Sequence, residues 1–287
     1  LEELQGKAAQ AWIKQENQRT TARFAQGEGF RQVEKQVLAL LNKESQIPWV
    51  TKRGEYYYNF WQDQANPRGL WRRTPLQEYR KDQPNWETVL DIDALGKAEG
   101  KDWVFHGSQS LAPEYRYCLL ELSPDGGDAT EIREFDLVTK QFVKDGFALP
   151  VAKSQASWID KDTLFVATDF GAGSMTQSGY ARIAKRWRRG TPLSAAQTLY
   201  EAQPQDMVVY AYHDHTPGFE RNYVGRSLDF YRRETYLLTA QDQKIKIDIP
   251  ADAEFSTHRE WLLVKPSSDW QVGETRYPSG ALLATHF

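Results

Sequence analysis

A unit of short strands and tight turns recurs along this sequence at intervals of roughly 50 residues, and this repeat constrains the fold more than any other feature. The clearest copy begins at Trp103 and contains four short apolar or alternating segments separated by turn residues. A second copy with the same order follows, in which Trp158 leads into the apolar segment 164–168. Four-stranded units repeated at this period are typical of a β-propeller.

Weaker copies of the unit occupy most of the remaining sequence, including the aromatic run at residues 56–61. The predicted fold is mainly β, a partial propeller of about five blades behind an N-terminal α-helical arm. A lone β-sandwich is the alternative, because it is also built from short strands separated by turns rich in Asp, Gly and Pro. We predict the blades at about residues 47–93, 103–150, 153–200, 205–250 and 254–287.

Residues 1–46 have a different pattern, with apolar side chains at helical spacing. Gly27 and Gly29 separate two predicted amphipathic helices. Their apolar stripes need cover, either from the propeller or from a domain outside this chain. The first stripe contains Leu4, Ala8, Ala11 and Trp12, and the second contains Phe30, Val33, Val37, Leu40 and Leu41.

Composition agrees with a globular protein and narrows the possible partners. The 287 residues carry a net charge of -3, so we expect no nucleic-acid partner. No apolar run approaches the length of a membrane span, so we expect no membrane partner. Cys118 is the single cysteine, which excludes a disulfide framework and predicts a buried structural thiol. Any targeting segment is expected outside this sequence, and cytoplasm is favoured over periplasm as the compartment.

Five segments carry a resemblance to a known family when taken in order: KAAQAWIKQENQRTTARF, LAPEYRYCLLELSPDGG, REFDLVTKQFV, ASWIDKDTLFVATDFG and SDWQVGETRYPSGALLA. Together they resemble the N-terminal part of the prolyl oligopeptidase family of serine peptidases. The resemblance implies a seven-bladed propeller, of which about five blades are present, capping an α/β-hydrolase domain. It also implies that the helical arm wraps onto the hydrolase and that the substrates are short peptides cut after proline.

The sequence lacks the nucleophile motif of an α/β-hydrolase. That motif, Gly-x-Ser-x-Gly, places the serine on a tight strand-to-helix turn. The nearest string, Gly225-Arg226-Ser227-Leu228-Asp229, lacks the second glycine and lies inside a predicted blade, so Ser227 is interpreted as an ordinary strand serine. We therefore expect no catalytic residue in this chain. By resemblance, the catalytic serine, aspartate and histidine belong to a hydrolase domain that the chain does not contain.

Four other constellations have simpler explanations than ligand binding. The His-Asp-His string at 213–215 lacks a third metal ligand at a recognised spacing. Residues 125–128 lack the spaced oxygen ligands of a calcium loop and predict a hairpin turn. Residues 171–174 lack the lysine and following helix of a phosphate loop and predict a flexible loop. The basic run at 185–189 predicts a solvated hairpin tip. No metal or cofactor is expected.

One long loop is the candidate functional region. Residues 169–180 interrupt a blade with a segment rich in Gly, Ser and Thr, and long loops of this kind are often mobile and functional. By resemblance, this loop and the stretch at Lys153 and Ser154 border the cavity that admits peptides. A surface loop without substrate contact is the alternative. The candidate gating residues are Lys153, Ser154, Phe170, Gly171, Gly173, Ser174 and Met175.

A second class of function stays open at this stage. Many propellers are stand-alone platforms for protein interaction and have no catalytic partner. The helical arm discriminates between the two classes, because stripes that remain uncovered at Trp12 and Phe30 favour a further domain.

Overall fold

The computed structural model describes residues 6–42, 48–124 and 126–287. Its Cα positions divide into two compact units, the first made of residues 1–49 and 62–67, the second of residues 50–61 and 68–287. The domain boundary predicted between residues 46 and 47 falls within the undescribed stretch 43–47 and stays a prediction. Leu4 and Asp125 also lie outside the described residues.

The first unit contains the two predicted helices, α1 (Lys7–Phe24) and α2 (Glu28–Leu41). Good helix formers such as Ala, Gln, Glu, Lys and Arg fill both segments. Gly27 caps α2, whereas Gly29 lies within its first turn rather than between the helices. The two helices do not bury each other's stripes, since Trp12 is 52% exposed and Phe30 is 45% exposed.

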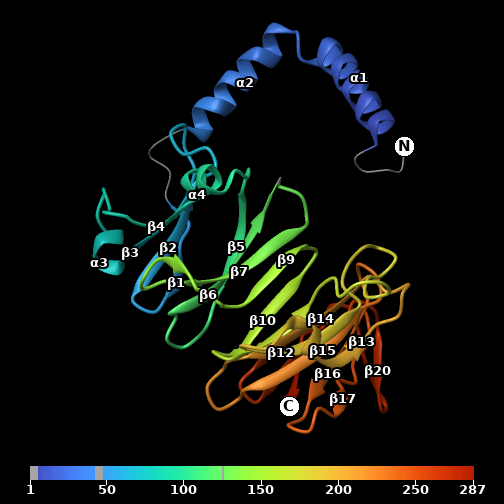
Figure 1. The fold of residues 1–287 in the computed structure, drawn as a ribbon. Coiled ribbons are helices and arrows are strands. Elements are labelled where there is room, and N and C mark those ends of the chain that lie inside the picture. The colour runs from blue at the N-terminus through green and yellow to red at the C-terminus, as the bar shows by residue number, and fades with distance from the viewer. Residues whose placement is uncertain (1–5, 43–47, 125) are drawn as a thin grey trace. The chain divides into compact units, whose positions relative to one another are not determined.

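The second unit is a succession of antiparallel sheets in which strand order follows chain order (Figure 1). The first sheet contains β1 (Thr51–Arg53), β2 (Tyr56–Trp61), β3 (Leu70–Pro75) and β4 (Glu87–Asp91), with α3 (Leu76–Tyr79) before β4 and α4 (Ile92–Glu99) after it. The second contains β5 (Val104–Ser110), β6 (Tyr117–Ser123), β7 (Thr130–Asp136), β8 (Gln141–Phe142) and β9 (Ala148–Ala152).

The chain continues through three further sheets. The third contains β10 (Gln155–Asp160), β11 (Thr163–Ala167), β12 (Ile183–Arg188) and β13 (Gln197–Glu201), with the short helix η1 (Leu193–Ala195) before β13. The fourth contains β14 (Val208–Asp214), β15 (Arg221–Ser227), β16 (Arg233–Leu238) and β17 (Lys244–Lys246). The fifth contains β18 (Glu254–His258), β19 (Trp261–Lys265) and β22 (Leu283–His286), and a separate hairpin joins β20 (Trp270–Val272) to β21 (Thr275–Tyr277).

Each sheet buries apolar side chains against the next sheet along the chain. Trp71 of the first sheet packs in one cluster with Phe135 of the second, and Leu119 of the second packs with Trp158 of the third. Leu199 of the third packs in turn with residues of the fourth, and the fourth packs with the fifth. Inner sheets are therefore covered on both faces, as in a propeller, and the sandwich alternative is wrong. The mainly β, partial propeller with an N-terminal helical arm is confirmed.

The second and fifth sheets differ from the four-strand repeat. In the second, β8 and β9 both pair with β7 and together fill the outermost position. The chain kinks between them at Gly146, which packs so closely on Glu134 that a Cβ there would meet the carboxylate at 2.8 Å. In the fifth, the β20–β21 hairpin is inserted between β19 and β22.

Alternating strand direction gives the sheets two ends. The turn after the first strand and the turn after the third lie at one end, which we call the turn end. The connection after the second strand and the link to the next sheet lie at the opposite end, which we call the loop end. Described residues in the connections at the loop end include 124, 126–129, 153–154, 168–182, 202–207, 228–232 and 266–282.

Candidate functional site

The predicted gating residues all lie at the loop end of the second and third sheets. Lys153 and Ser154 form the link between β9 and β10, and the other five belong to the loop 168–182 between β11 and β12. Residues 153–154 lead from the second sheet to the third at the end where the β6–β7 and β11–β12 connections also lie. The fold therefore brings these two segments close together although they are separate in the sequence.

Lys153 joins three loop-end connections. Its Nζ atom lies 3.2 Å from Asp128 Oδ2, in the connection between β6 and β7. The same ammonium lies 4.3 Å from the centroid of the Tyr180 ring, in the loop 168–182. The hydrogen bond with Asp128 raises the pKa of Lys153, so the group stays charged at neutral pH. Charge pairing and a cation–π contact thus hold the three segments together at the surface.

Ser154 forms the base of the same assembly. Its hydroxyl lies 2.6 Å from the hydroxyl of Thr168, the first residue after β11. Thr168 is fully buried. The hydroxyl pair fixes where the loop leaves the sheet, so Ser154 has a structural partner.

The first half of the loop is folded around Ser174, which is only 3% exposed. The Ser174 hydroxyl donates to the Gly171 carbonyl at 2.6 Å and accepts from the Phe170 amide at 2.8 Å. Gly171 and Gly173 have φ values of +103° and +79°, which a residue with a Cβ adopts only with strain. Internal hydrogen bonds hold this turn, and the expectation of a flexible loop stays a prediction.

The second half of the loop is a small closed turn braced against the next link. Thr176 donates its amide to the Tyr180 carbonyl at 2.8 Å and its hydroxyl to the Met207 carbonyl at 3.0 Å. The Gln177 amide donates to the Pro204 carbonyl at 2.8 Å. The loop 168–182 is therefore attached to the connection 202–207 that leads into the fourth sheet.

Phe170 and Met175 serve as anchors. Phe170 is half-buried against the core between the second and third sheets, and its ring lies 4.2 Å from Lys185 Nζ. Met175 pairs with Ala181 in an isolated antiparallel bridge. The exposed residues of the loop are Asp169, 171–173 and 177–179, and Lys153 and Tyr180 beside them are partly exposed.

Sequence reasoning missed three residues of this assembly. Asp128 and Tyr180 hold Lys153, and the Arg182 guanidinium donates to the carbonyls of Gly173 and Ala202. Tyr180 is the one with a signal in the sequence, since it is the large aromatic at the end of a small-residue loop. Nothing in the sequence singled out Asp128 or Arg182, because each contacts a partner in another connection only after the sheets stack.

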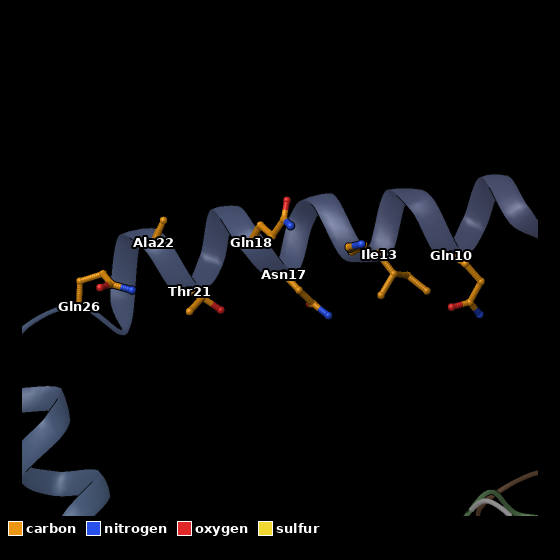
Figure 2. Close-up of a pocket in the computed structure, with 8 residues that line it drawn as sticks. Gln10, Ile13, Asn17, Gln18, Thr21, Ala22 and Gln26 are labelled. Carbon is orange, nitrogen blue, oxygen red and sulfur yellow. The ribbon is translucent and has the colours of Figure 1, made fainter.

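Surface hollows elsewhere do not form a site. One of about 620 Å³ is lined by residues of α1 and by Gln26 just beyond its end (Figure 2). A second, beside α4, is lined by charges of both signs, among which Arg68 pairs with Asp102. The residues that line the first are Gln10, Ile13, Lys14, Asn17, Gln18, Thr21, Ala22 and Gln26.

The remaining sequence candidates have structural roles. His213 contacts Asn222, and His215 contacts the Trp158 carbonyl. Ser227 ends strand β15, paired with Val208 and Arg233, as an ordinary strand serine. Cys118 is fully buried, as predicted.

The described part of the chain offers neither a metal-binding cluster nor a membrane-spanning helix. Within residues 6–42, 48–124 and 126–287 there is no cluster of three or more His, Cys, Asp or Glu side chains able to hold a metal ion. Nor is any helix there long and apolar enough to cross a membrane.

Sheets of about four strands that stack face to face along the chain define a β-propeller domain. A family model described as the N-terminal β-propeller domain of prolyl oligopeptidase matches residues 1–247. The chain belongs to this family.

Relatives and a solved structure agree with the family assignment. Uncharacterized peptidase y4nA of Sinorhizobium fredii is 34% identical over 299 residues, covering 99% of this chain and 40% of that protein. Uncharacterized peptidase RP174 of Rickettsia prowazekii is 30% identical over 305 residues, covering 100% of this chain and 42% of that protein. The structure of a post-proline cleaving enzyme from Rickettsia typhi matches with a TM-score of 0.90 at 30% identity, covering 100% of this chain and 43% of that one. This chain thus spans about two fifths of the length of these proteins.

Proposed function

We propose that this chain is the propeller region of a serine peptidase that cuts short proline-containing peptides. In this proposal the loop end of the sheets controls the access of peptides to an α/β-hydrolase domain in the part of the relatives that this chain does not cover. The chain contributes selection of substrates by size, and the hydrolase domain contributes the nucleophile and the oxyanion site. Short peptides are the proposed substrates.

One observation carries the proposal: the Lys153 assembly, which braces three connections at the loop end. A gate that excludes folded proteins must resist being pushed aside, and a braced loop does so better than a mobile one. The ammonium with its two contacts, to Asp128 and to Tyr180, supplies this brace.

Chain topology supports placing the hydrolase domain at the loop end. Each complete sheet has four strand positions, so the chain leaves a sheet at the end where it entered. The first strand, β1, starts at the loop end, and every further complete sheet returns the chain there. A domain joined to the propeller before its first sheet or after its last one then lies at the loop end.

The uncovered helical stripes favour this proposal over a stand-alone platform. Within their own unit α1 and α2 leave Trp12 and Phe30 about half exposed. Such stripes are typical of surfaces that another domain covers.

The test is Lys153→Met in the full-length peptidase. Loss of the brace should raise the turnover of a long peptide relative to a short one, because the loop then yields to larger substrates. We expect the ratio of kcat/KM for a peptide of about 40 residues to that for a pentapeptide to rise several-fold, with kcat for the pentapeptide unchanged. This point change tests the brace more selectively than removal of residues 172–177. The deletion would also remove the hydroxyls of Ser174 and Thr176, which hold the loop by hydrogen bonds.

Lys161→Met is the matched control. Lys161 is an exposed lysine in the turn between β10 and β11, at the turn end of the same sheet. It should leave the ratio unchanged. An unchanged ratio for Lys153→Met as well would contradict the gating role.

A further inference from the structure

Two aromatic side chains protrude side by side from the turn between β15 and β16. Phe230 is 87% exposed and Tyr231 is 83% exposed. Aromatic side chains bury large areas on association and are over-represented among the residues that dominate binding energies. Adjacent aromatic rings at such exposure mark a surface that another molecule or domain covers.

The turn that carries them is held in one conformation. Asp229 Oδ1 accepts the amides of Tyr231 and Arg232 at 2.9 and 2.8 Å. Asp229 Oδ2 pairs with Arg232 Nε at 2.7 Å, and the Leu228 amide donates to the Arg232 carbonyl at 2.8 Å. Because the backbone is already ordered, covering the two rings costs little further conformational entropy.

The turn belongs to the loop end. It follows the second strand of the fourth sheet, as the loop 168–182 follows the second strand of the third. The two are also linked by hydrogen bonds, since Met207 donates its amide to Ser227 and accepts the Thr176 hydroxyl on its carbonyl. Ser227 is the residue immediately before this turn.

We propose that Phe230 and Tyr231 are a docking point for the hydrolase domain of the same polypeptide, an inference that rests on the function proposed above. Two observations indicate that the hydrolase domain covers these rings: the length of the relatives and the topology of the sheets. The relatives contain more than half of their length outside the aligned region, and complete sheets return the chain to the loop end. The surface that receives the rings is apolar and offers a hydrogen-bond acceptor to the tyrosine hydroxyl.

A matched control exists at the opposite end of the second sheet. Val138 is 65% exposed in the turn between β7 and β8. That turn is also fixed by an aspartate, because Asp136 Oδ1 accepts the amides of Val138 and Thr139. Val138 is thus an exposed apolar side chain on an aspartate-fixed turn at the turn end.

The experiment measures thiol labelling of Phe230→Cys, Tyr231→Cys and Val138→Cys in the full-length peptidase, relative to each variant unfolded in urea. Cys118 adds little background, because burial raises its pKa and blocks access. Val138→Cys should label near the unfolded rate, and the two loop-end variants at least about tenfold more slowly. Phe230→Cys labelling as fast as Val138→Cys would overturn the proposal. So would protection that disappears on dilution, since it would assign the surface to a second copy.

A photo-crosslink identifies what covers the rings. Phe230 is replaced by p-benzoylphenylalanine, which keeps an aromatic side chain, and the crosslinked peptides are identified by mass spectrometry. A crosslink to the part of the polypeptide beyond this chain is expected, and crosslinks confined to this chain would contradict it. Both readouts are independent of peptide size selection. Failure of the gating role with protection intact is therefore distinguishable from failure of the docking role.

Discussion

At the scale of single residues, His215 shows how stacking the sheets sets chemistry. Its Nε2 lies 3.0 Å from the Trp158 carbonyl of the third sheet, and its ring lies 4.4 Å from that of His213. Burial lowers the pKa of His215, and the neighbouring His213 lowers it further, against the opposing charges of Asp214 and Glu220. The folded state therefore holds His215 neutral at a pH where the unfolded chain is protonated.

The sign of the pH dependence follows from this pKa. Above about pH 6.5, the ordinary pKa of histidine, the His215 ring is neutral in both the folded and the unfolded chain, so its titration does not change the free energy of unfolding. As the pH falls below that value the unfolded chain binds a proton first, so folding stability decreases until the folded pKa is reached. His215→Gln keeps a donor for the Trp158 carbonyl and should lose less stability between pH 8 and pH 5, measured by urea unfolding. An equal loss in the variant and the wild type would contradict this role.

Residue roles were predictable only where they depend on local sequence. Cys118 in an apolar strand was predicted buried, and Ser227 was predicted to be a strand serine, because strand pattern decides both. The partnership of Lys153 with Asp128 and Tyr180 depends on three connections meeting after the sheets stack. Ser174 was predicted to be a gating residue, and that role stays a prediction. The sequence did not show that its hydroxyl bonds within its own turn, as a serine among glycines can do.

At the scale of elements, Gly225 in β15 makes a testable contribution. A Cβ at this position would overlap the carbonyl oxygen of Glu234 and lie 2.6 Å from the Tyr210 ring. The Tyr210 hydroxyl bonds to Glu234 and Thr235 across this gap. Gly225→Ala should therefore lower the free energy of unfolding by about 2 kcal/mol, since overpacking of a tight site typically costs 1–3 kcal/mol.

Gly29→Ala controls for the change in residue type. A Cβ at Gly29 meets nothing within 4 Å, and the residue lies in α2, where alanine is the better helix former. It should leave the stability equal or slightly increased. Denaturant unfolding measures the free energy of unfolding of both variants. A Gly225→Ala protein as stable as the wild type would contradict the prediction, because the neighbouring strand would then have moved to admit the Cβ without cost.

Element identity was largely readable from the sequence, while element pairing was not. Turn residues and alternating strands indicated the successive sheets and the two helices. The sequence carried no indication that β8 and β9 share one position, because this depends on the kink at Gly146 against Glu134. The hairpin β20–β21 was equally hidden, since its strands pair with each other and not with the sheet.

At the scale of the whole molecule, the repeat fixed the architecture because each sheet depends mainly on its neighbours. Ion pairs follow the same rule. Glu87 and Lys140 join the first two sheets, Glu134 and Arg189 join the second to the third, and Arg186 and Asp242 join the third to the fourth. What covers the apolar stripes of the helical arm stays a prediction, because stripe residues such as Trp12 and Phe30 are about half exposed.

Nearest-neighbour stacking predicts a gradient of local stability along the molecule. The third sheet is covered on both faces, whereas the fifth packs against the fourth and leaves Trp261 of β19 39% exposed. When each unit is stabilised only by its neighbours, opening starts at an end that has one neighbour. Amides of β19 and β22 should therefore exchange with solvent at least about tenfold faster than those of β11 and β12, a difference of about 1.4 kcal/mol in opening free energy. Hydrogen exchange followed by mass spectrometry measures both sets in one sample. In the full-length peptidase, further sheets packed on the fifth should remove most of the difference. Uniform protection in the chain alone would instead mean that the five sheets open as a single cooperative unit.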